Sequence, residues 1–402
     1  MPTDCFKKSM RNNCALLTLL LAWLTLAGEA QVSRYSTAFT VSRKDFADTI
    51  PISIERGQVT LPVRLNGKTY RFLLDTGASQ TTLFDDTPIE GCQEAGYTFS
   101  HDAISARYMV SKVVLPPMTL GNTTFTGCHA VVQHRAVRRK GIDGIVGFDI
   151  ICKGISAKID TRRGHFILTD KESHFDREPG IAMRYRLDYH VPYIEVCPFG
   201  KYRERVLFDT GSPSLYVMNK KSFDLGEKTM KEGLGRQVEG RSTGRYAIGY
   251  GGVEPRGEVV FLALDEVKLG GYSLCNLHTL TTQGDSHLGA KLLEYGSVVF
   301  LPRRKRLCFQ PWIIGQQRVE VDNQQFQKAV IPVDGKPVIG LIWEGSDAYQ
   351  AGFREGDIIL KADNQAFSSF ADYVRFRPLT GHVYRFFLRD SRGFTKEVKS
   401  VW

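Results

Sequence analysis

The chain has 402 residues, of which 42% are apolar, and its formal net charge is +10. This length gives room for two or three compact domains, and the ordinary apolar content excludes a wholly disordered chain. The basic residues are scattered, and their short clusters at residues 138–140 and 303–306 contain no aromatic residue. Because a nucleic-acid-binding surface gathers its positive charge on one face, we expect no nucleic-acid partner.

The N-terminal segment has the features of an export signal. Basic residues at positions 7–11 precede an apolar run over residues 15–27, and small residues follow within 28–30. This order predicts a signal peptide over residues 1–30 with cleavage after Ala30. A membrane span usually needs roughly 20 apolar residues, so an uncleaved anchor is the less favoured alternative. We therefore expect an exported protein with no stable membrane span after cleavage.

The cysteines that follow this segment fit either a reduced or a disulfide-bonded protein. They are Cys92, Cys128, Cys152, Cys197, Cys275 and Cys308. Export makes disulfides feasible, and the sequence leaves their connectivity open. Because no CxxC pair occurs, we expect neither a zinc site nor a thioredoxin-type site, and no cofactor.

An internal repeat organises the chain. Residues 62–79 and 194–214 each contain two apolar-rich strands joined by a Gly-Lys turn, and the second strand leads into Asp-Thr-Gly. Downstream, each copy has a Leu-Gly turn, a stretch with a cysteine and a histidine, a glycine at 147 or 289, and two strands around a basic turn. The common order indicates duplication of one β-rich lobe. We expect a short helical segment after Gly147 and after Gly289.

The two Asp-Thr-Gly sequences begin at Asp75 and Asp209. One copy alone is a common turn sequence, but two copies at equivalent points of a duplicated lobe indicate a shared site. Two carboxylates about 3 Å apart cannot both be ionised, so they share one proton. The ionised member can take a proton from water while the protonated member donates to a substrate carbonyl. We therefore expect Asp75 and Asp209 to form a catalytic pair.

The residues beside the aspartates have matching roles. Gly77 and Gly211 lack side chains, which allows the two loops to approach each other. The hydroxyl groups of Thr76 and Thr210 can cross-link the loops by hydrogen bonds. The hydroxyl group of Ser212 can hydrogen-bond one of the carboxylates.

After residue 311 the pattern changes. Residues 338–343 and 358–360 read as strands, residues 344–357 hold a short helical turn between glycines, and residues 370–376 have helical spacing before a last strand at 384–388. This order predicts a separate small α+β domain. The expected organisation is a signal peptide (1–30), an N-terminal lobe (31–180), a C-terminal lobe (181–314) and a last domain (315–402).

Residues 50–311 resemble the bilobal pepsin-like and retropepsin-like aspartic proteases. The resemblance is carried by residues 72–79 and 206–212, which contain the Asp-Thr-Gly sequences, and by the turns 145–147 and 287–289. It implies a mostly β, two-lobed acid-protease-type β-barrel unit that hydrolyses peptide bonds of protein or peptide substrates, without a metal. It also implies that the two turn glycines, Gly147 and Gly289, pack behind the catalytic loops.

Two further expectations follow from the same resemblance. Members of this family cover the site with a hairpin that bears a key aromatic residue, and residues 97–108 are the best stretch for it. Its candidates are Tyr97, Phe99 and Tyr108. Because both aspartates lie in one chain, no dimer is required to assemble the pair.

The C-terminal domain resembles a bacterial PDZ domain, through residues 339–343, 345–353 and 356–360. The resemblance implies capture of an extended peptide or a C-terminus along a sheet edge. The expected carboxylate-binding loop is Val338, Ile339, Gly340 and Leu341. The bacterial type of the domain favours the periplasm, the cell surface or the exterior. A packing domain without a ligand is the alternative.

Two other classes of protein remain open. A trypsin-like serine protease with a PDZ domain would use Ser286 in a Gly-Asp-Ser sequence, His129 and an acid such as Asp160. A non-catalytic protein of protease fold would hold peptides without cleaving them. Inhibition by a serine-reactive reagent would favour the first, and equal results for the wild type and an Asp75→Asn variant would favour the second.

Overall fold

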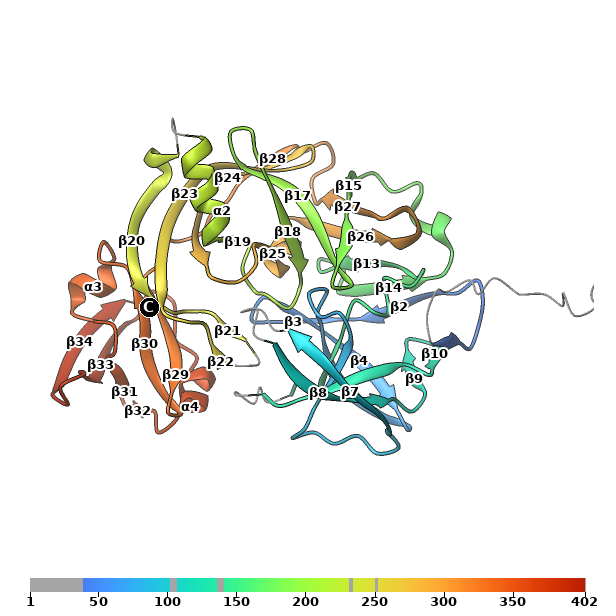
Figure 1. Cartoon of the computed structure of the whole chain (residues 1–402), viewed down its shortest axis with the longest axis horizontal. Helices are drawn as coiled ribbons and strands as arrows, with labels where there is room; N and C mark the ends of the chain where they lie inside the picture. Colours follow the sequence, from blue (N-terminus) through green and yellow to red (C-terminus); the bar gives the residue numbers. More distant parts are fainter. Residues whose placement is uncertain (1–38, 102–106, 136–140, 231–233, 250–251, 402) are drawn as a thin grey trace, which may run out of the picture. The chain divides into compact units, whose positions relative to one another are not determined.

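The computed structural model describes residues 39–101, 107–135, 141–230, 234–249 and 252–401. The expected signal peptide and its cleavage point lie outside these ranges. The described residues are mostly β, which confirms the expected fold class, and their strands form curved sheets (Figure 1). None of the helices within these ranges is both long and apolar enough to cross a membrane.

The first lobe is built on one large sheet. Its spatial order is β1-β10-β9-β4-β5-β12-β6-β11-β8-β7, with β3 paired to β4. The bounds are β1 Thr40–Val41, β3 Ser53–Glu55, β4 Gln58–Leu65, β5 Lys68–Leu74, β6 Thr81–Phe84, β7 Gln93–His101, β8 Arg107–Val114, β9 Met118–Leu120, β10 Thr123–Thr126, β11 His129–Gln133 and β12 Gly144–Val146. Strand β4 alternates buried and exposed residues over its second half, as expected of a strand with one face on the core.

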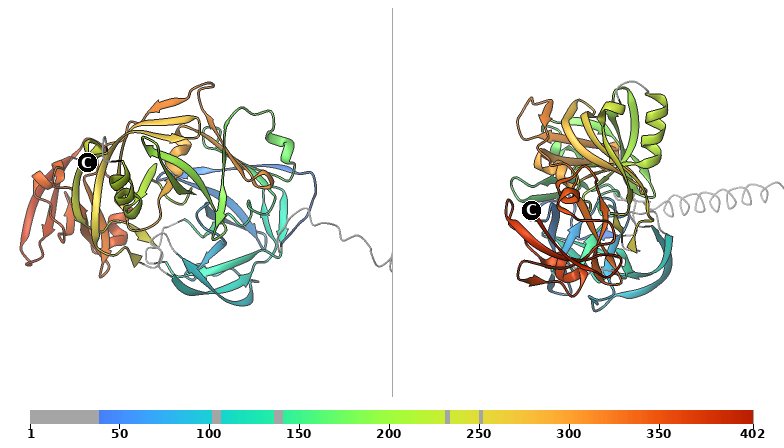
Figure 2. Two further views of the ribbon diagram at one scale, coloured as in Figure 1. Left: turned by 45° about the horizontal axis from the view of Figure 1, so that its top comes forward. Right: turned by 90° about the vertical axis from the view of Figure 1, so that its left-hand side faces the viewer.

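The second lobe repeats this plan with a sheet of order β16-β17-β18-β25-β19-β24-β23-β20, to which β28 adds by pairing with β24. The bounds are β16 Arg186–Asp188, β17 Val191–Phe199, β18 Tyr202–Asp209, β19 Tyr216–Asn219, β20 Val238–Gly244, β23 Gly257–Leu269, β24 Tyr272–Thr282, β25 His287–Gly289 and β28 Arg318–Glu320. Strand β20 pairs with residues 257–262 of β23, and the two strands lie side by side (Figures 1 and 2). A short hairpin, β21 Ile248–Gly249 with β22 Gly252–Val253, lies between them in sequence.

A third sheet joins the two halves of the repeat. Its order is β15-β27-β26-β13-β14-β2, with bounds β2 Ala47–Pro51, β13 Ser156–Asp160, β14 His165–Thr169, β15 Ile181–Arg184, β26 Gly296–Leu301 and β27 Arg306–Pro311. The central strands β13 and β26 are buried along their whole length and pair through Ala157–Phe300 and Ile159–Val298. Backbone hydrogen bonds therefore cross from one half of the duplicated unit to the other.

Within the described ranges the helical content is small. It consists of α2 Lys220–Thr229, α3 Asp347–Ala351, α4 Phe370–Arg375 and the short 3-10 segments η1 Glu172–Phe175, η2 Gly235–Gln237, η3 Ala290–Glu294 and η4 Pro302–Arg304. Of the two helical segments expected after the repeat glycines, only η3 forms, as a 3-10 turn. Residues 148–154 form turns instead, because the β-branched Ile150 and Ile151 disfavour a helix and Gly154 reverses the chain at φ 103°.

The C-terminal sheet has the order β29-β30-β31-β33-β34, with β32 paired to β31. The bounds are β29 Lys328–Val333, β30 Lys336–Ile342, β31 Ile358–Ala362, β32 Gln365–Ala366, β33 Val383–Arg389 and β34 Thr395–Val401. We expected residues 384–388 to form the last strand. This prediction is wrong, because β34 follows them. Strand β34 buries only Val398 fully, so its sequence has little of the apolar alternation that indicates a strand.

The C-terminal sheet packs directly on the second lobe. Leu341 of β30 is fully buried in a cluster with Val259 and Phe261 of β23. The N–H of Arg245 donates to the carbonyl of Gly340 at 2.9 Å. Both aromatic and main-chain contacts thus hold β30 against the second lobe.

We expect Leu341→Ala to lower the free energy of unfolding by about 2–4 kcal/mol, because it empties a fully buried leucine site. The measurement is urea unfolding followed by circular dichroism. Leu379→Ala is the matched control, since Leu379 is 68% exposed and its loss should change stability by less than about 0.5 kcal/mol. Equal stability of the two variants would contradict the packing of β30 on β23.

The cysteines of the described ranges are all free thiols: Cys92, Cys128, Cys152, Cys197, Cys275 and Cys308. The disulfides that export would have made feasible are therefore not formed among them. Burial raises the pKa of several of these thiols, including Cys92 and Cys308, which disfavours the reactive thiolate.

Candidate active site

Each aspartate is positioned by a strand pair that recurs in both lobes. Strand β5 runs parallel to β12 and ends just before Asp75, whose N–H donates to the carbonyl of Val146 at 3.0 Å. Strand β18 runs parallel to β25 and ends at Asp209, which lies opposite Gly289. Because β5 ends in three buried residues and Leu288 and Gly289 of β25 are buried, each aspartate follows or pairs with a strand end that lies in the core.

The structure brings the two carboxyl groups together. Each aspartate lies against the glycine of the opposite loop. A Cβ atom added at Gly77 would lie 2.6 Å from Oδ1 of Asp209, and one added at Gly211 would overlap the carboxyl group of Asp75. Each loop therefore needs its glycine because the carboxyl group of the opposite loop occupies the space of a side chain.

Asp75 is buried and Asp209 is half-buried, and the burial of Asp75 affects the protonation of the pair. Asp75 is 9% exposed. Burial, followed by the negative charge of Asp209 and the hydrogen bond to it, raises the pKa of Asp75 well above its usual value. The N–H groups of Gly77 and Ala78 donate to Asp75 Oδ1 at 2.8 and 3.0 Å and oppose this rise only in part. The pair consequently retains a proton at a pH where separate carboxylates are ionised.

The two threonines cross-link the loops through a reciprocal set of hydrogen bonds. The hydroxyl group of Thr76 donates to the carbonyl of Phe208 at 2.6 Å and accepts from the N–H of Thr210 at 3.1 Å. The hydroxyl group of Thr210 donates to the carbonyl of Leu74 at 2.7 Å and accepts from the N–H of Thr76 at 3.0 Å. Both threonines are fully buried, so these bonds fix the distance between the loops.

Gly147 and Gly289 lie directly behind the two loops. A Cβ atom at Gly147 would be 2.8 Å from the carbonyl oxygen of Ala78, and one at Gly289 would be 2.7 Å from that of Ser212. The next residue in each copy, Phe148 or Ala290, donates its N–H to that same carbonyl at 2.8 Å. Only glycine leaves room for these bonds.

Ser212 has a different partner from the one expected. Its hydroxyl group contacts that of Ser214 at 2.6 Å, and Ser214 in turn contacts Nε2 of His287 at 3.1 Å. The carboxyl group of Asp209 receives instead the N–H of Gly211 at 2.8 Å. Sequence reasoning missed the Ser214–His287 contact because these residues are far apart in the chain.

The stretch expected to cover the site is a hairpin of β7 and β8, and residues 102–106 of it lie outside the described ranges. Tyr97 and Phe99 are exposed on one face of β7, and Arg107 lies over the ring of Phe99 at 3.9 Å. Tyr108, on the opposite face of the hairpin, is half-buried. Tyr97 and Phe99 are therefore available for contact with another molecule.

The expected carboxylate-binding residues of the C-terminal domain, Val338, Ile339, Gly340 and Leu341, do not form an open loop. They lie within β30 and are buried. The N–H of Ile339 donates to the carbonyl of Asp357 at 2.9 Å, and its carbonyl accepts from Gly356 at 2.8 Å. With the carbonyl of Gly340 bound to Arg245, this segment already has main-chain partners.

The residues of a serine-protease triad are not assembled. The hydroxyl group of Ser286 donates to the carboxylate of Glu204 and accepts from the N–H of Asn219 at 2.7 Å. Asp160 accepts from Arg163, and His129 lies in β11 of the other lobe. Within the described ranges, no three His, Cys, Asp or Glu side chains are grouped as a metal site would require.

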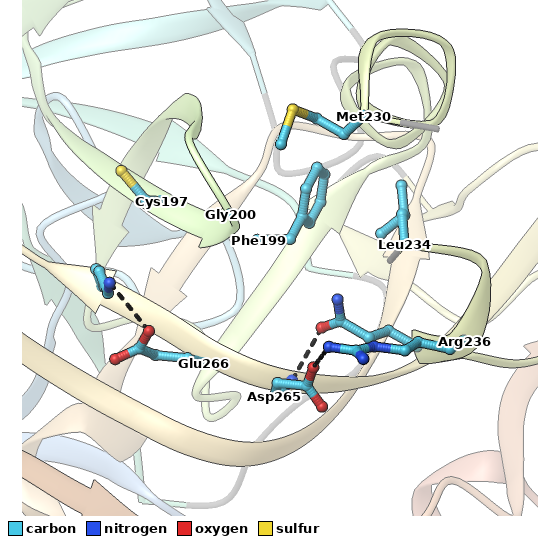
Figure 3. Close-up of a pocket in the computed structure, with 10 residues that line it drawn as sticks. Cys197, Phe199, Gly200, Met230, Leu234, Arg236, Asp265 and Glu266 are labelled. Carbon is cyan, nitrogen blue, oxygen red and sulfur yellow. Dashed lines mark hydrogen bonds and ion pairs between the residues drawn. The ribbon is translucent and has the colours of Figure 1, made fainter. Parts of the chain in front are cut away.

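A cavity of about 260 Å³ lies elsewhere in the second lobe, between the β17–β18 turn, the end of α2 and β23 (Figure 3). Its carboxylates are each paired with a cation, Asp265 with Arg236 at 3.0 Å and Glu266 with Lys268 at 3.1 Å. A hydrogen bond from Ser273 and the charge of Lys268 lower the pKa of Glu266. The carboxylates of the cavity are thus paired with cations, whereas Asp75 faces another carboxyl group.

Comparison with known proteins gives one match to a family. Residues 61–150 match a family model described as aspartyl protease. This segment contains the first Asp-Thr-Gly loop and the turn at Gly147. Together with the second loop at the equivalent point of the other lobe, the match identifies an aspartyl protease fold.

Solved structures similar to this chain include an aspartic proteinase from Irpex lacteus, with 13% identity and a TM-score of 0.42, covering 66% of this chain and 97% of that one. Basic 7S globulin from soybean has 10% identity and a TM-score of 0.41, covering 66% and 95%. Conglutin gamma, a basic 7S globulin from lupine seeds, has 12% identity and a TM-score of 0.40, with the same coverage. No curated protein sequence matches the chain.

Proposed function

We propose that this protein is an exported aspartic endopeptidase that hydrolyses peptide bonds of protein or peptide substrates. One observation carries the proposal. The carboxyl groups of Asp75 and Asp209, from equivalent loops of a duplicated lobe, each lie against the glycine of the opposite loop, and burial and the charge of Asp209 raise the pKa of Asp75. The aspartyl protease family match of residues 61–150 supports it.

The chemistry follows from the shared proton. The ionised carboxyl group accepts a proton from a water molecule, and the water attacks the carbon of the scissile peptide bond. The protonated carboxyl group donates to the carbonyl oxygen, so no charge is left on the tetrahedral intermediate. The protonated carboxyl group then gives its proton to the leaving nitrogen while the ionised one takes a proton from a hydroxyl group of the intermediate, so the C–N bond breaks and the pair again holds one proton. Thr76 and Thr210 hold the two loops at the distance that this exchange needs.

The pH dependence of cleavage has a definite sign. The reaction needs one proton on the pair, and the raised pKa of Asp75 keeps that proton bound above the ordinary carboxyl pKa of about 4. We expect cleavage to fall by at least about 10-fold as the pH rises from 5 to 9, because the pair then loses the one proton that it needs. The measurement is kcat/KM for a labelled peptide from pH 3 to 9. A profile that rises with pH, as an imidazole base gives, would contradict the assignment.

The test of the function is cleavage of a denatured protein by the mature chain, with products identified by mass spectrometry. We expect inhibition by a pepstatin-type transition-state analogue and no effect of a serine-reactive reagent. The opposite pattern would favour the serine-protease reading. Absence of cleavage across a peptide library at both acidic and neutral pH would favour a peptide-holding protein of this fold.

A further inference from the structure

The tight turn between β3 and β4 touches the second catalytic loop. Arg56 and Gly57 form this turn with φ values of 52° and 75°, as two-residue hairpin turns require. A Cβ atom at Gly57 would lie 3.4 Å from Cβ of Pro213. The turn therefore packs against the segment that follows Gly211.

Gln58, the first residue after this turn, reaches Gly211 itself. Gln58 is 4% exposed, and its Nε2 donates to the carbonyl of Gly211. The N–H of Gly211 donates to Oδ1 of Asp209 at 2.8 Å. Gly211 thus donates its N–H to Asp209 and accepts a hydrogen bond from Gln58 at its own carbonyl. Because a glycine has the widest range of backbone angles, this bond removes a freedom that would otherwise misalign Asp209.

The duplicated lobe supplies an internal comparison. In the second copy, the equivalent turn is Tyr189 and His190 between β16 and β17, and Val191 pairs across it as Gln58 does in the first. The side chain of Val191 has no hydrogen-bond donor, so it cannot hold the loop of Asp75 in the way that Gln58 holds the loop of Asp209. That loop has instead a second N–H donor to its aspartate, from Ala78 at 3.0 Å. The two loops are therefore stabilised in different ways.

We propose that Gln58 is a positioning residue for peptide hydrolysis, acting through Gly211 to orient the carboxyl group of Asp209 toward Asp75. This inference rests on the proposed function. The turn that precedes Gln58 has a further contact, because Nη2 of Arg56 donates to the carbonyl of Val374 in α4 at 2.5 Å. The C-terminal domain thereby contributes to fixing the position of this turn.

The first experiment removes the hydrogen-bond donor of Gln58 and keeps the approximate shape of its side chain. In Gln58→Met, we expect kcat to fall about 10-fold at every pH while KM changes less than about 2-fold, because orientation of the pair is lost and substrate binding is not. Gln237→Met is the matched control, since Gln237 is also a buried glutamine with a main-chain partner, the N–H of Asp265. It should leave kcat unchanged. Wild-type kcat in Gln58→Met would overturn the proposal.

A second variant separates positioning from packing. In Gln58→Glu, a neutral carboxyl group can still donate to the carbonyl of Gly211, whereas an ionised one can only accept. We expect its kcat to approach that of the wild type at acidic pH and to fall below that of Gln58→Met as the pH rises. An equal loss at all pH values would show a packing role and overturn the proposal.

Failure of the proposed function is distinguishable from failure of this inference. If the wild type shows no cleavage that depends on Asp75 and Asp209, the function fails, and the positioning role is tested without turnover. Proteins labelled with ¹³C at aspartate carboxyl groups are titrated by NMR, as wild type and as Gln58→Met. We expect the titration of the Asp75–Asp209 pair to shift in the variant and stay unchanged in Gln237→Met. Identical titrations of Gln58→Met and wild type would overturn the inference.

Discussion

Asp209→Asn and Asp75→Asn should each lower kcat/KM by at least about 10³-fold, because an amide cannot exchange the proton that the pair shares. The measurement is cleavage of a denatured protein and of a labelled peptide at pH 4 and pH 7. Since both residues act on one proton, the double variant should be no less active than either single variant. Residual cleavage near the wild-type level in either variant would contradict the shared-proton mechanism.

The stability of Asp75→Asn provides the control for folding. The pKa of Asp75 is raised in the folded protein, so the contribution of this residue to stability is fully present below the unfolded carboxyl pKa of about 4 and is lost as the pH rises through the folded value. Asparagine carries no charge at either pH. The variant should therefore melt at the same temperature as the wild type at pH 3 and at a higher temperature at pH 7. A lower melting temperature at pH 7 would contradict the burial of this carboxyl group.

Gly77→Ala and Gly211→Ala are expected to have the next largest effects. A methyl group at Gly77 would lie 2.6 Å from Oδ1 and 2.7 Å from Cγ of Asp209, and one at Gly211 would overlap the carboxyl group of Asp75. Neither loop can retreat, because buried bonds of Thr76 and Thr210 join them. We expect about a 10²-fold or larger loss of kcat and a loss of about 1–3 kcal/mol in the free energy of unfolding.

The control for the two glycine substitutions is Gly235→Ala. Gly235 has open space around the position of an added Cβ atom and an ordinary negative φ, so the same substitution should change neither kcat nor stability measurably. Kinetics and thermal melting of the variants decide the outcome. Full activity in Gly211→Ala would show that the two carboxyl groups are farther apart in solution than in the structure.

Local sequence was sufficient for several elements of the fold. The strand–turn–strand pattern before each Asp-Thr-Gly predicted β4–β5 and β17–β18, because apolar alternation and a Gly-Lys turn are local signals. The helix α2 was missed, although Asn219 caps it by accepting from the N–H groups of Lys221 and Ser222.

Residue order along the chain predicted the two Asp-Thr-Gly loops and their equivalence within a duplicated lobe, and the resemblance to bilobal aspartic proteases predicted the position of Gly147 and Gly289. These features depend on residue type and order along the chain. Only the tertiary structure decided that Ser212 bonds to Ser214, that β30 is packed against the second lobe, and that Gln58 holds Gly211. Gln58 and Gly211 are 153 positions apart, and a hydrogen bond over that separation depends on how two lobes pack, which no local pattern records.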